Sequence, residues 1–150
     1  MFDDEGATDT GAAYIFTYSG GSCDTGTKIV APDKQQADRY GVSVGMSGNG
    51  TKVIVGAYIE DPDNLSSAGS AYIYAYDGSN WDTGTKIVAS DREASDIFGY
   101  SVAMRGDGTE IIVGAEFEDN NIFGGAESDR GGTAYTITCD GSSWDKGQTI

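Results

Sequence analysis

The stretch "DIFGYSVAMRGDGTEIIVGAE" at residues 96–116 overlies "DRYGVSVGMSGNGTKVIVGAY" at residues 38–58, an interval of 58 residues. Within the first stretch large and small side chains alternate: Phe98, Tyr100 and Val102 are separated by glycine and serine. A period of two is typical of a β-strand with one large face and one small face. Repetition at this interval is typical of solenoids, propellers or arrays.

A second segment occurs three times in the chain. Its copies are "GAAYIFTYSGGSCDTGTK" (11–28), "GSAYIYAYDGSNWDTGTK" (69–86) and "GTAYTITCDGSSWDKGQT" (132–149). The third copy lies 63 residues after the second, five more than the 58-residue interval. The sequence is therefore divided into a partial unit holding the last two strands, a full unit, and a full unit with a longer loop between its second and third strands: 1–33, 34–90 and 91–150.

Each full unit is predicted to form four antiparallel strands. Asn49-Gly50 and Asp107-Gly108 supply the first hairpin turn, because both residue types tolerate positive φ. Sheets that are apolar on both faces must stack on similar sheets, which predicts an all-β fold of β-propeller blades rather than a β-solenoid. The predicted strands are 40–46, 52–57, 70–76, 81–89, 98–104, 110–115, 133–139 and 144–150.

The chain supplies about two and a half repeats, whereas propellers close with about four to eight blades. It is therefore expected to be a fragment of a longer chain or a self-assembling subunit that completes itself with other copies. Left alone, it would expose sheet faces and unpaired strand edges.

The tripeptide Arg105-Gly106-Asp107 spells a signal that cell-adhesion ligands present to integrins. One repeat earlier, the same position reads Ser47-Gly48-Asn49. We therefore interpret the tripeptide as the first hairpin turn of a blade, given the weakness of a short motif alone.

Composition excludes several classes of protein. The chain has 24 acidic and 9 basic residues, no histidine and a formal net charge of -15. Nucleic acids and anionic membranes need positive charge, so neither is an expected partner. No stretch approaches the roughly 20 apolar residues of a membrane span, so membrane insertion is not expected. The chain has no histidine to act as a general base and no cofactor loop, so it is not expected to be an enzyme.

The segments "FGYSVA" (98–103) with "IVGA" (112–115), and "YGVSVG" (40–45) with "IVGA" (54–57), resemble the FG-GAP repeats of integrin α-like propellers. The resemblance implies a propeller, usually seven-bladed, that works in adhesion or binding at the cell surface or outside the cell, without catalysis. Many relatives carry an Asp-x-Asp-x-Asp-Gly calcium loop after the first strand. This chain has one Asp or Asn per loop, so that site is not carried over.

Strand parity places the loops between strands 2 and 3 at the same end as the connections between units. These loops, "EDPDNLSSAG" (60–69) and "EFEDNNIFGGAESDRGG" (116–132), are rich in acidic residues. The plainer interpretation is that the acids are solvated loop residues. The alternative is a cation site, with Ca²⁺ as first choice because it prefers carboxylate oxygens. The candidate metal ligands are Asp61, Asp63, Asn64, Glu118, Asp119 and Asn121.

Three further features leave alternatives open. The recurring strand tyrosines could bind sugars, but their period favours packing between blades. Asn64 and Asn49 fit the N-glycosylation pattern, and Asn64 in the long loop is the better acceptor if the protein is secreted by a eukaryote. Cys23 and Cys139 are expected to be two buried free thiols, with a bond between chains as the alternative.

The sequence thus predicts a non-enzymatic extracellular β-propeller segment for adhesion, recognition or cell-surface structure. Its expected partners are a protein or glycan ligand, or copies of itself. The alternative is a structural subunit of an extracellular filament or sheath assembled by repeat stacking. An accessory domain of a carbohydrate-active enzyme is less favoured.

Overall fold

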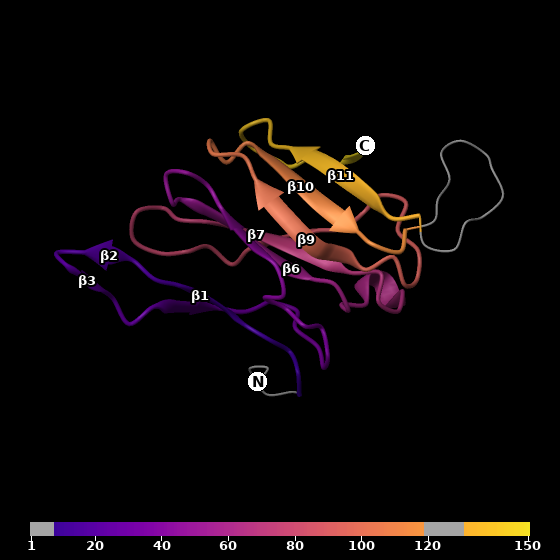
Figure 1. Cartoon of the computed structure of the whole chain (residues 1–150), viewed down its shortest axis with the longest axis horizontal. Coiled ribbons are helices and arrows are strands. Elements are labelled where there is room, and N and C mark those ends of the chain that lie inside the picture. Colours follow the sequence, from indigo (N-terminus) through magenta and orange to yellow (C-terminus); the bar gives the residue numbers. More distant parts are fainter. Residues whose placement is uncertain (1–7, 119–130) are drawn as a thin grey trace.

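The computed structural model describes residues 8–118 and 131–150, and almost all of its regular structure is β-strand. Two complete sheets each contain four antiparallel strands in sequence order (Figure 1). The first complete sheet consists of β5 (Val44–Met46), β6 (Lys52–Ala57), β7 (Ser70–Ala75) and β8 (Thr85–Ile87). The second consists of β9 (Phe98–Met104), β10 (Glu110–Ala115), β11 (Thr133–Thr138) and β12 (Gln148–Thr149).

The N-terminal part of the chain forms two short antiparallel pairs. One joins β1 (Ala13–Ile15) to β4 (Thr27–Ile29), and the other joins β2 (Tyr18–Ser19) to β3 (Ser22–Cys23). These pairs occupy the place of the third and fourth strands of a sheet. The prediction of an all-β fold of four-stranded antiparallel blades is confirmed, and the described residues do not close into a ring (Figure 1).

The outer strands are shorter than predicted. In place of a strand over 81–89, the structure has an isolated bridge between Tyr76 and Trp81, followed by β8. The Asp82 carboxylate accepts a hydrogen bond from the Gly84 N–H at 3.0 Å, and this local turn interrupts the ladder. The fourth strand of the next sheet is interrupted in the same way, where Asp145 binds the Gly147 N–H at 2.9 Å.

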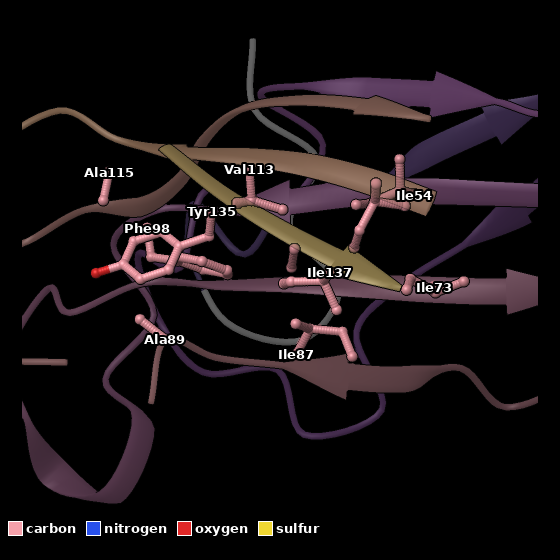
Figure 2. Packing of buried hydrophobic residues seen from close by; sticks show 11 residues of the cluster. Ile54, Ile73, Ile87, Ala89, Phe98, Val113, Ala115, Tyr135 and Ile137 are labelled. Atoms are coloured by element: carbon pink, nitrogen blue, oxygen red, sulfur yellow. The ribbon is translucent and has the colours of Figure 1, made fainter. Parts of the chain in front are cut away.

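The two complete sheets pack face to face through one apolar cluster (Figure 2). The first sheet contributes Ile54, Ala71 and Ile73, and the second contributes larger side chains, including Phe98 and Tyr135. The rings of Phe98 and Tyr135 meet edge to face with centroids 5.4 Å apart. The large face of one sheet therefore covers the smaller face of the one before it.

A second cluster joins the N-terminal pairs to the first complete sheet. Tyr40 and Tyr72 form the equivalent edge-to-face pair, with centroids 5.6 Å apart, and pack with Ile29 and Val55. Tyr72 is fully buried, which supports packing as the role of the recurring tyrosines. Trp81 and Trp144 pack at the margins of the two clusters.

The backbones of the two complete sheets approach each other closely at Gly56 and Gly99. Gly99 has φ +91°, and a Cβ at this residue would lie 2.2 Å from the Ser70 carbonyl oxygen. A Cβ at Gly56 would lie 2.0 Å from the Gly99 carbonyl oxygen. Both positions require glycine because any side chain would separate the two sheets.

The two cysteines differ in burial. The prediction that both thiols are buried is wrong for Cys23, which is exposed on the β2–β3 hairpin, while Cys139 is half-buried. All four residues of the short strands β2 and β3 are exposed. The 3₁₀ turn spans Pro62–Asn64. In the described part of the chain, no helix is long and apolar enough to cross a membrane.

Candidate functional site

The acidic loops and the connections between units lie at one end of the sheets, as strand parity predicts. Backbone hydrogen bonds hold them together: the Ser95 N–H donates to the Ser66 carbonyl at 2.8 Å, and the Phe98 N–H donates to the Ala68 carbonyl at 2.9 Å. The preceding connection is held in the same way, because the Tyr40 N–H donates to the Thr10 carbonyl at 3.0 Å. We call residues 30–40, 58–69, 88–97 and 116–118 the acidic end.

Four acids of the acidic end are buried and serve the fold. Asp38 accepts the Gln35 backbone N–H, and Asp96 accepts the Glu93 backbone N–H, so each carboxylate ties down one connection. Glu60 and Glu118 are the other two buried acids. Burial raises the pKa of Asp38 to about 6, and the neighbouring carboxylates of Glu60, Asp33 and Asp61 add to the effect.

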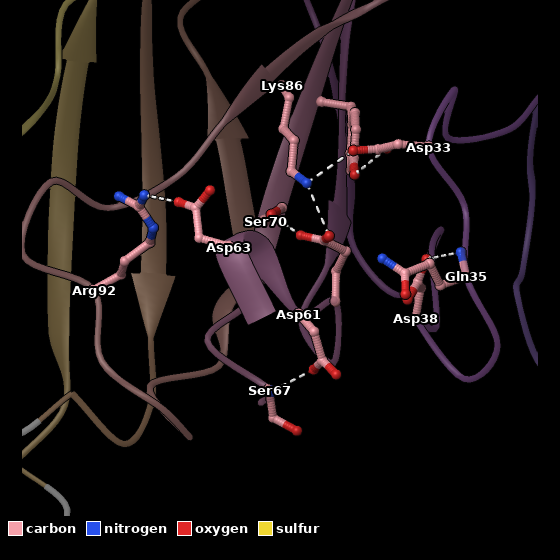
Figure 3. A network of polar contacts seen from close by, with 11 residues as sticks. Asp33, Gln35, Asp38, Asp61, Asp63, Ser67, Ser70, Lys86 and Arg92 are labelled. Carbon is pink, nitrogen blue, oxygen red and sulfur yellow. Dashed lines mark hydrogen bonds and ion pairs between the residues drawn. The ribbon is translucent and has the colours of Figure 1, made fainter. Parts of the chain in front are cut away.

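Lys86 is the centre of a polar network in the first complete sheet (Figure 3). Its ammonium lies 2.8 Å from the Asp33 carboxylate and 2.8 Å from the Glu60 carboxylate. The Ser70 hydroxyl also donates to Glu60, and the Tyr72 hydroxyl donates to Asp33 at 2.7 Å. Glu60 is only 1% exposed, so this ammonium is what balances its charge in a dry environment.

The network shifts the ionisation of its members. Although burial opposes the shift, hydrogen bonds from Lys86 and Tyr72 lower the pKa of Asp33. Burial also opposes the charged form of Lys86, but the Asp33 and Glu60 carboxylates raise the pKa of its ammonium. Burial, followed by the hydrogen bond to Asp33, raises the pKa of Tyr72.

The second complete sheet repeats part of this network. The Tyr135 hydroxyl donates to Asp91 at 2.9 Å, as Tyr72 does to Asp33. Glu118 is buried at the position equivalent to Glu60. Thr149 pairs with Tyr135 across the ladder where Lys86 pairs with Tyr72, so a threonine occupies the place of the lysine.

The exposed acids project from loops that are fixed in position. The Asp61 carboxylate accepts the Ser67 N–H at 2.6 Å, which closes the loop on itself. The Asp63 carboxylate forms an ion pair with Arg92, whose other guanidinium nitrogen donates to the Ala89 carbonyl at 3.0 Å (Figure 3). The exposed acids of the acidic end are Asp33, Asp61, Asp63, Asp91, Glu93 and Glu116.

The candidate calcium ligands of the first loop have other partners or lie apart in the described residues. Asp61 binds a backbone N–H and Asp63 binds a guanidinium, while Asn64 is exposed in the left-handed region at φ 65°. Within 8–118 and 131–150, no group of three or more acidic side chains is placed to hold a metal ion.

In the second loop, Glu118 is buried, whereas Asp119 and Asn121 lie outside the described residues. Calcium binding at these loops therefore stays a prediction, as does glycosylation of the exposed Asn64 and Asn49.

The first hairpins do not fit the calcium loop of the relatives. The first of these hairpins contains no carboxylate, and the Ser47 hydroxyl donates to the Asn49 side-chain oxygen at 2.8 Å. In the other hairpin, the Arg105 guanidinium lies 3.1 Å from the Asp107 carboxylate and neutralises it. The Gly108 N–H donates to the Arg105 carbonyl at 2.8 Å, so the tripeptide forms the tight turn that its alignment predicts.

Comparison with known proteins identifies the family. The model of the FG-GAP repeat matches residues 25–74 and 81–137, which is more than half of the chain. The chain therefore belongs to the FG-GAP repeat family, and the resemblance of its motifs is confirmed. Members of this family are typically non-enzymatic, and the repeats occur in extracellular or surface proteins. No curated protein matches the chain.

The sequence alone did not identify Lys86, Ser70 and the hydroxyl of Tyr72 as partners of the acids. One feature of the sequence could have pointed to Lys86, because it is the only basic residue in the fourth strand of its sheet. Its role depends on the distance from strand 4 to the loop after strand 2, which spacing along the chain does not give.

Proposed function

We propose that the chain is a non-enzymatic extracellular recognition module that binds a basic protein partner through its acidic end. Two general facts support this role: the family is typically non-enzymatic, and its repeats occur in extracellular or surface proteins. Binding residues tend to occur on loops that a regular scaffold holds in place. A net charge of -15 favours a positively charged ligand.

The observation that carries the proposal is the fixed geometry of the exposed carboxylates. Asp61 is tied to the Ser67 N–H, and the loop that bears it is bonded to the next connection through Ser66 and Ala68. Ligand binding would thus order few additional side chains or loops, which reduces its entropic cost.

The experiment uses a lysine-rich peptide as the probe and compares two triple variants of equal charge. Asp61→Asn, Glu93→Gln and Glu116→Gln neutralise the acidic end, whereas Asp107→Asn, Asp140→Asn and Asp145→Asn neutralise the opposite hairpins. We expect the first variant to weaken binding by about tenfold or more at low salt and the second to change it little. Equal loss in both variants would mean that only the net charge attracts the probe.

A second function, a structural subunit that assembles by stacking, is favoured by the open faces at the two ends of the stack. Tyr14 is 50% exposed where its equivalent Tyr72 is buried, and Ile112 is 43% exposed where its equivalent Ile54 is buried. Stacking of one copy on the next would cover both faces.

Sedimentation over a range of concentrations tests this second function. Assembly predicts a mass that rises with concentration and falls back to the monomer in Ile112→Asp. A monomer at every concentration contradicts it.

A further inference from the structure

We propose that a groove between the N-terminal pairs and the first complete sheet binds a neutral oligosaccharide. The groove has a volume of about 950 Å³, inside the range of roughly 300–1,000 Å³ that is usual for small-molecule sites. Its walls come from the end of β1, from β2 and from β4 on one side, and from the turns of the first complete sheet on the other. We call it the aromatic groove, after Phe16, Tyr18, Tyr74, Tyr76 and Trp81.

Three aromatic residues of this groove are exposed: Phe16 by 59%, Tyr18 by 72% and Tyr76 by 38%. Tyr74 is buried and forms part of the groove wall. On the opposite wall, the rings of Tyr76 and Trp81 are tilted by 40° with centroids 5.3 Å apart. The face of an aromatic ring is negative and attracts C–H groups that carry partial positive charge, and pyranose rings present such groups on their faces.

Polar groups also line the groove, and backbone hydrogen bonds hold two of its carboxylates in place. Asp24 uses one carboxylate oxygen to accept the Thr17 and Gly26 N–H groups, at 3.1 and 2.9 Å, and Asp82 uses one for Gly84. The Asn80 side chain also lines the groove. Carboxylate and amide groups of this kind bind sugar hydroxyls.

The charge of the groove selects among glycans. Asp24 and Asp82 face it with a single cationic side chain, Lys28. Together with a net charge of -15, these carboxylates repel sulfated, phosphorylated or sialylated sugars, and neutral sugars remain. The groove shares only Val30 and Pro32 with the acidic end, and the three acids exchanged in the peptide test lie outside it, so the two proposed sites can be tested separately.

The equivalent space between the two complete sheets is different. There Ile137 and Cys139 replace Tyr74 and Tyr76. The Lys52 ammonium also lies 5.5 Å from the centroid of the Trp144 ring. The aromatic groove is therefore particular to one junction of the molecule and is not a general property of the stack.

The test is a calorimetric titration of the whole chain with millimolar chitotriose, cellotriose and maltotriose. We expect at least one trisaccharide to bind, with an affinity that sodium chloride does not change because the ligand is neutral. Tyr18→Ala removes an exposed ring and Asn80→Ala removes a polar group, and each is expected to weaken binding by about tenfold. Tyr100→Ala, an exposed ring outside the groove, is the matched control and is expected to leave binding unchanged.

Several results would overturn the proposal. One is no binding of any trisaccharide by the folded protein, and another is binding that Tyr18→Ala and Asn80→Ala leave intact. A third is self-association that Tyr18→Ala reverses, because a second copy would then be the occupant. Circular dichroism of each variant checks the fold, and two variants that act on different chemistry keep the test decisive if one of them unfolds. Loss of peptide binding at the acidic end, with trisaccharide binding retained, would contradict only the proposed function.

Discussion

The two complete sheets have equivalent carboxylates at the acidic end, but these carboxylates have different partners. Asp33 and Asp91 each accept a tyrosine hydroxyl, and Glu60 and Glu118 are each buried. Lys86 neutralises this region in the first sheet, whereas the second has Thr149 at the same place in the ladder. The carboxylates and tyrosines thus define the connection in both sheets, and the lysine is an addition that stabilises one of them.

The largest effect is expected where the two sheets are alike. Gly99→Ala places a Cβ within 2.2 Å of the Ser70 carbonyl oxygen at a φ of +91°. Because both atoms belong to packed backbone, we expect a loss of about 3 kcal/mol or more in the free energy of unfolding. Urea denaturation measures it. Gly50→Ala, at positive φ with no neighbour near its Cβ, is the control and should cost about 1 kcal/mol. Equal losses would mean that backbone strain alone is responsible.

The next largest effect is expected when the first sheet is changed to resemble the second. Lys86→Thr copies the second sheet and leaves the Glu60 carboxylate buried without its ammonium. We expect a loss of about 2–3 kcal/mol, reduced from the value for a fully buried pair because the lysine side chain is 29% exposed. Thermal and urea unfolding measure it. Adding Glu60→Gln should recover much of the loss, and no recovery would show that the lysine acts through packing.

Asp38 should make stability depend on pH. Its folded pKa of about 6 lies above the ordinary 3.8, so its ionisation costs the folded state above pH 6. As the pH falls from 7 through 6 to about 4, the folded state takes up the proton first and this cost disappears. Asp38→Asn keeps an oxygen for the Gln35 N–H and should be about 1–2 kcal/mol more stable at pH 7. Urea unfolding between pH 4.5 and 7 tests this, and a variant that keeps the slope of the parent chain contradicts it.

A smaller effect is expected from the reverse exchange in the second sheet. Thr149→Lys places an ammonium where Lys86 lies in the first sheet, within reach of the Glu118 and Asp91 region by the shared ladder register. We expect a gain of about 1 kcal/mol, because the strand is near the surface and the lysine loses side-chain entropy. Thermal unfolding measures the gain. Thr149→Met is the control for side-chain length, and an equal gain there would exclude an electrostatic cause.

The smallest expected effect concerns the thiols. Cys23 and Cys139 are free in the structure, and replacing both by serine should leave the unfolding midpoint nearly unchanged, because neither is fully buried. A covalent dimer on non-reducing electrophoresis would establish the alternative of a bond between chains.

The sequence predicted the strands of the complete sheets closely because their alternation is a local property. Residues 52–57, 98–104 and 110–115 are strands with the predicted bounds, whereas the strand predicted over 40–46 is regular only at Val44–Met46. The outer strands were predicted to be too long because Asp82 and Asp145 form turns. The hydrogen bonds of these turns cannot be read from the alternation of large and small residues. The acidic end was found by parity, but the sorting of its acids into buried and exposed was not. Lys86 reaches Asp33 across 53 residues of chain, a contact that only the packed structure reveals.

The bonds between one loop and the next connection have a mechanical consequence. The bridge between Gly69 and Phe98 runs parallel, and the Ser95, Ile97 and Phe98 N–H groups all donate to successive carbonyls of the loop. A pull on the loop is therefore shared by several hydrogen bonds loaded together, and the force passes into the neighbouring sheet. We expect this connection to resist tension by loading its hydrogen bonds together in shear. The hydrogen bonds of a hairpin pulled apart from its ends would instead break one after another.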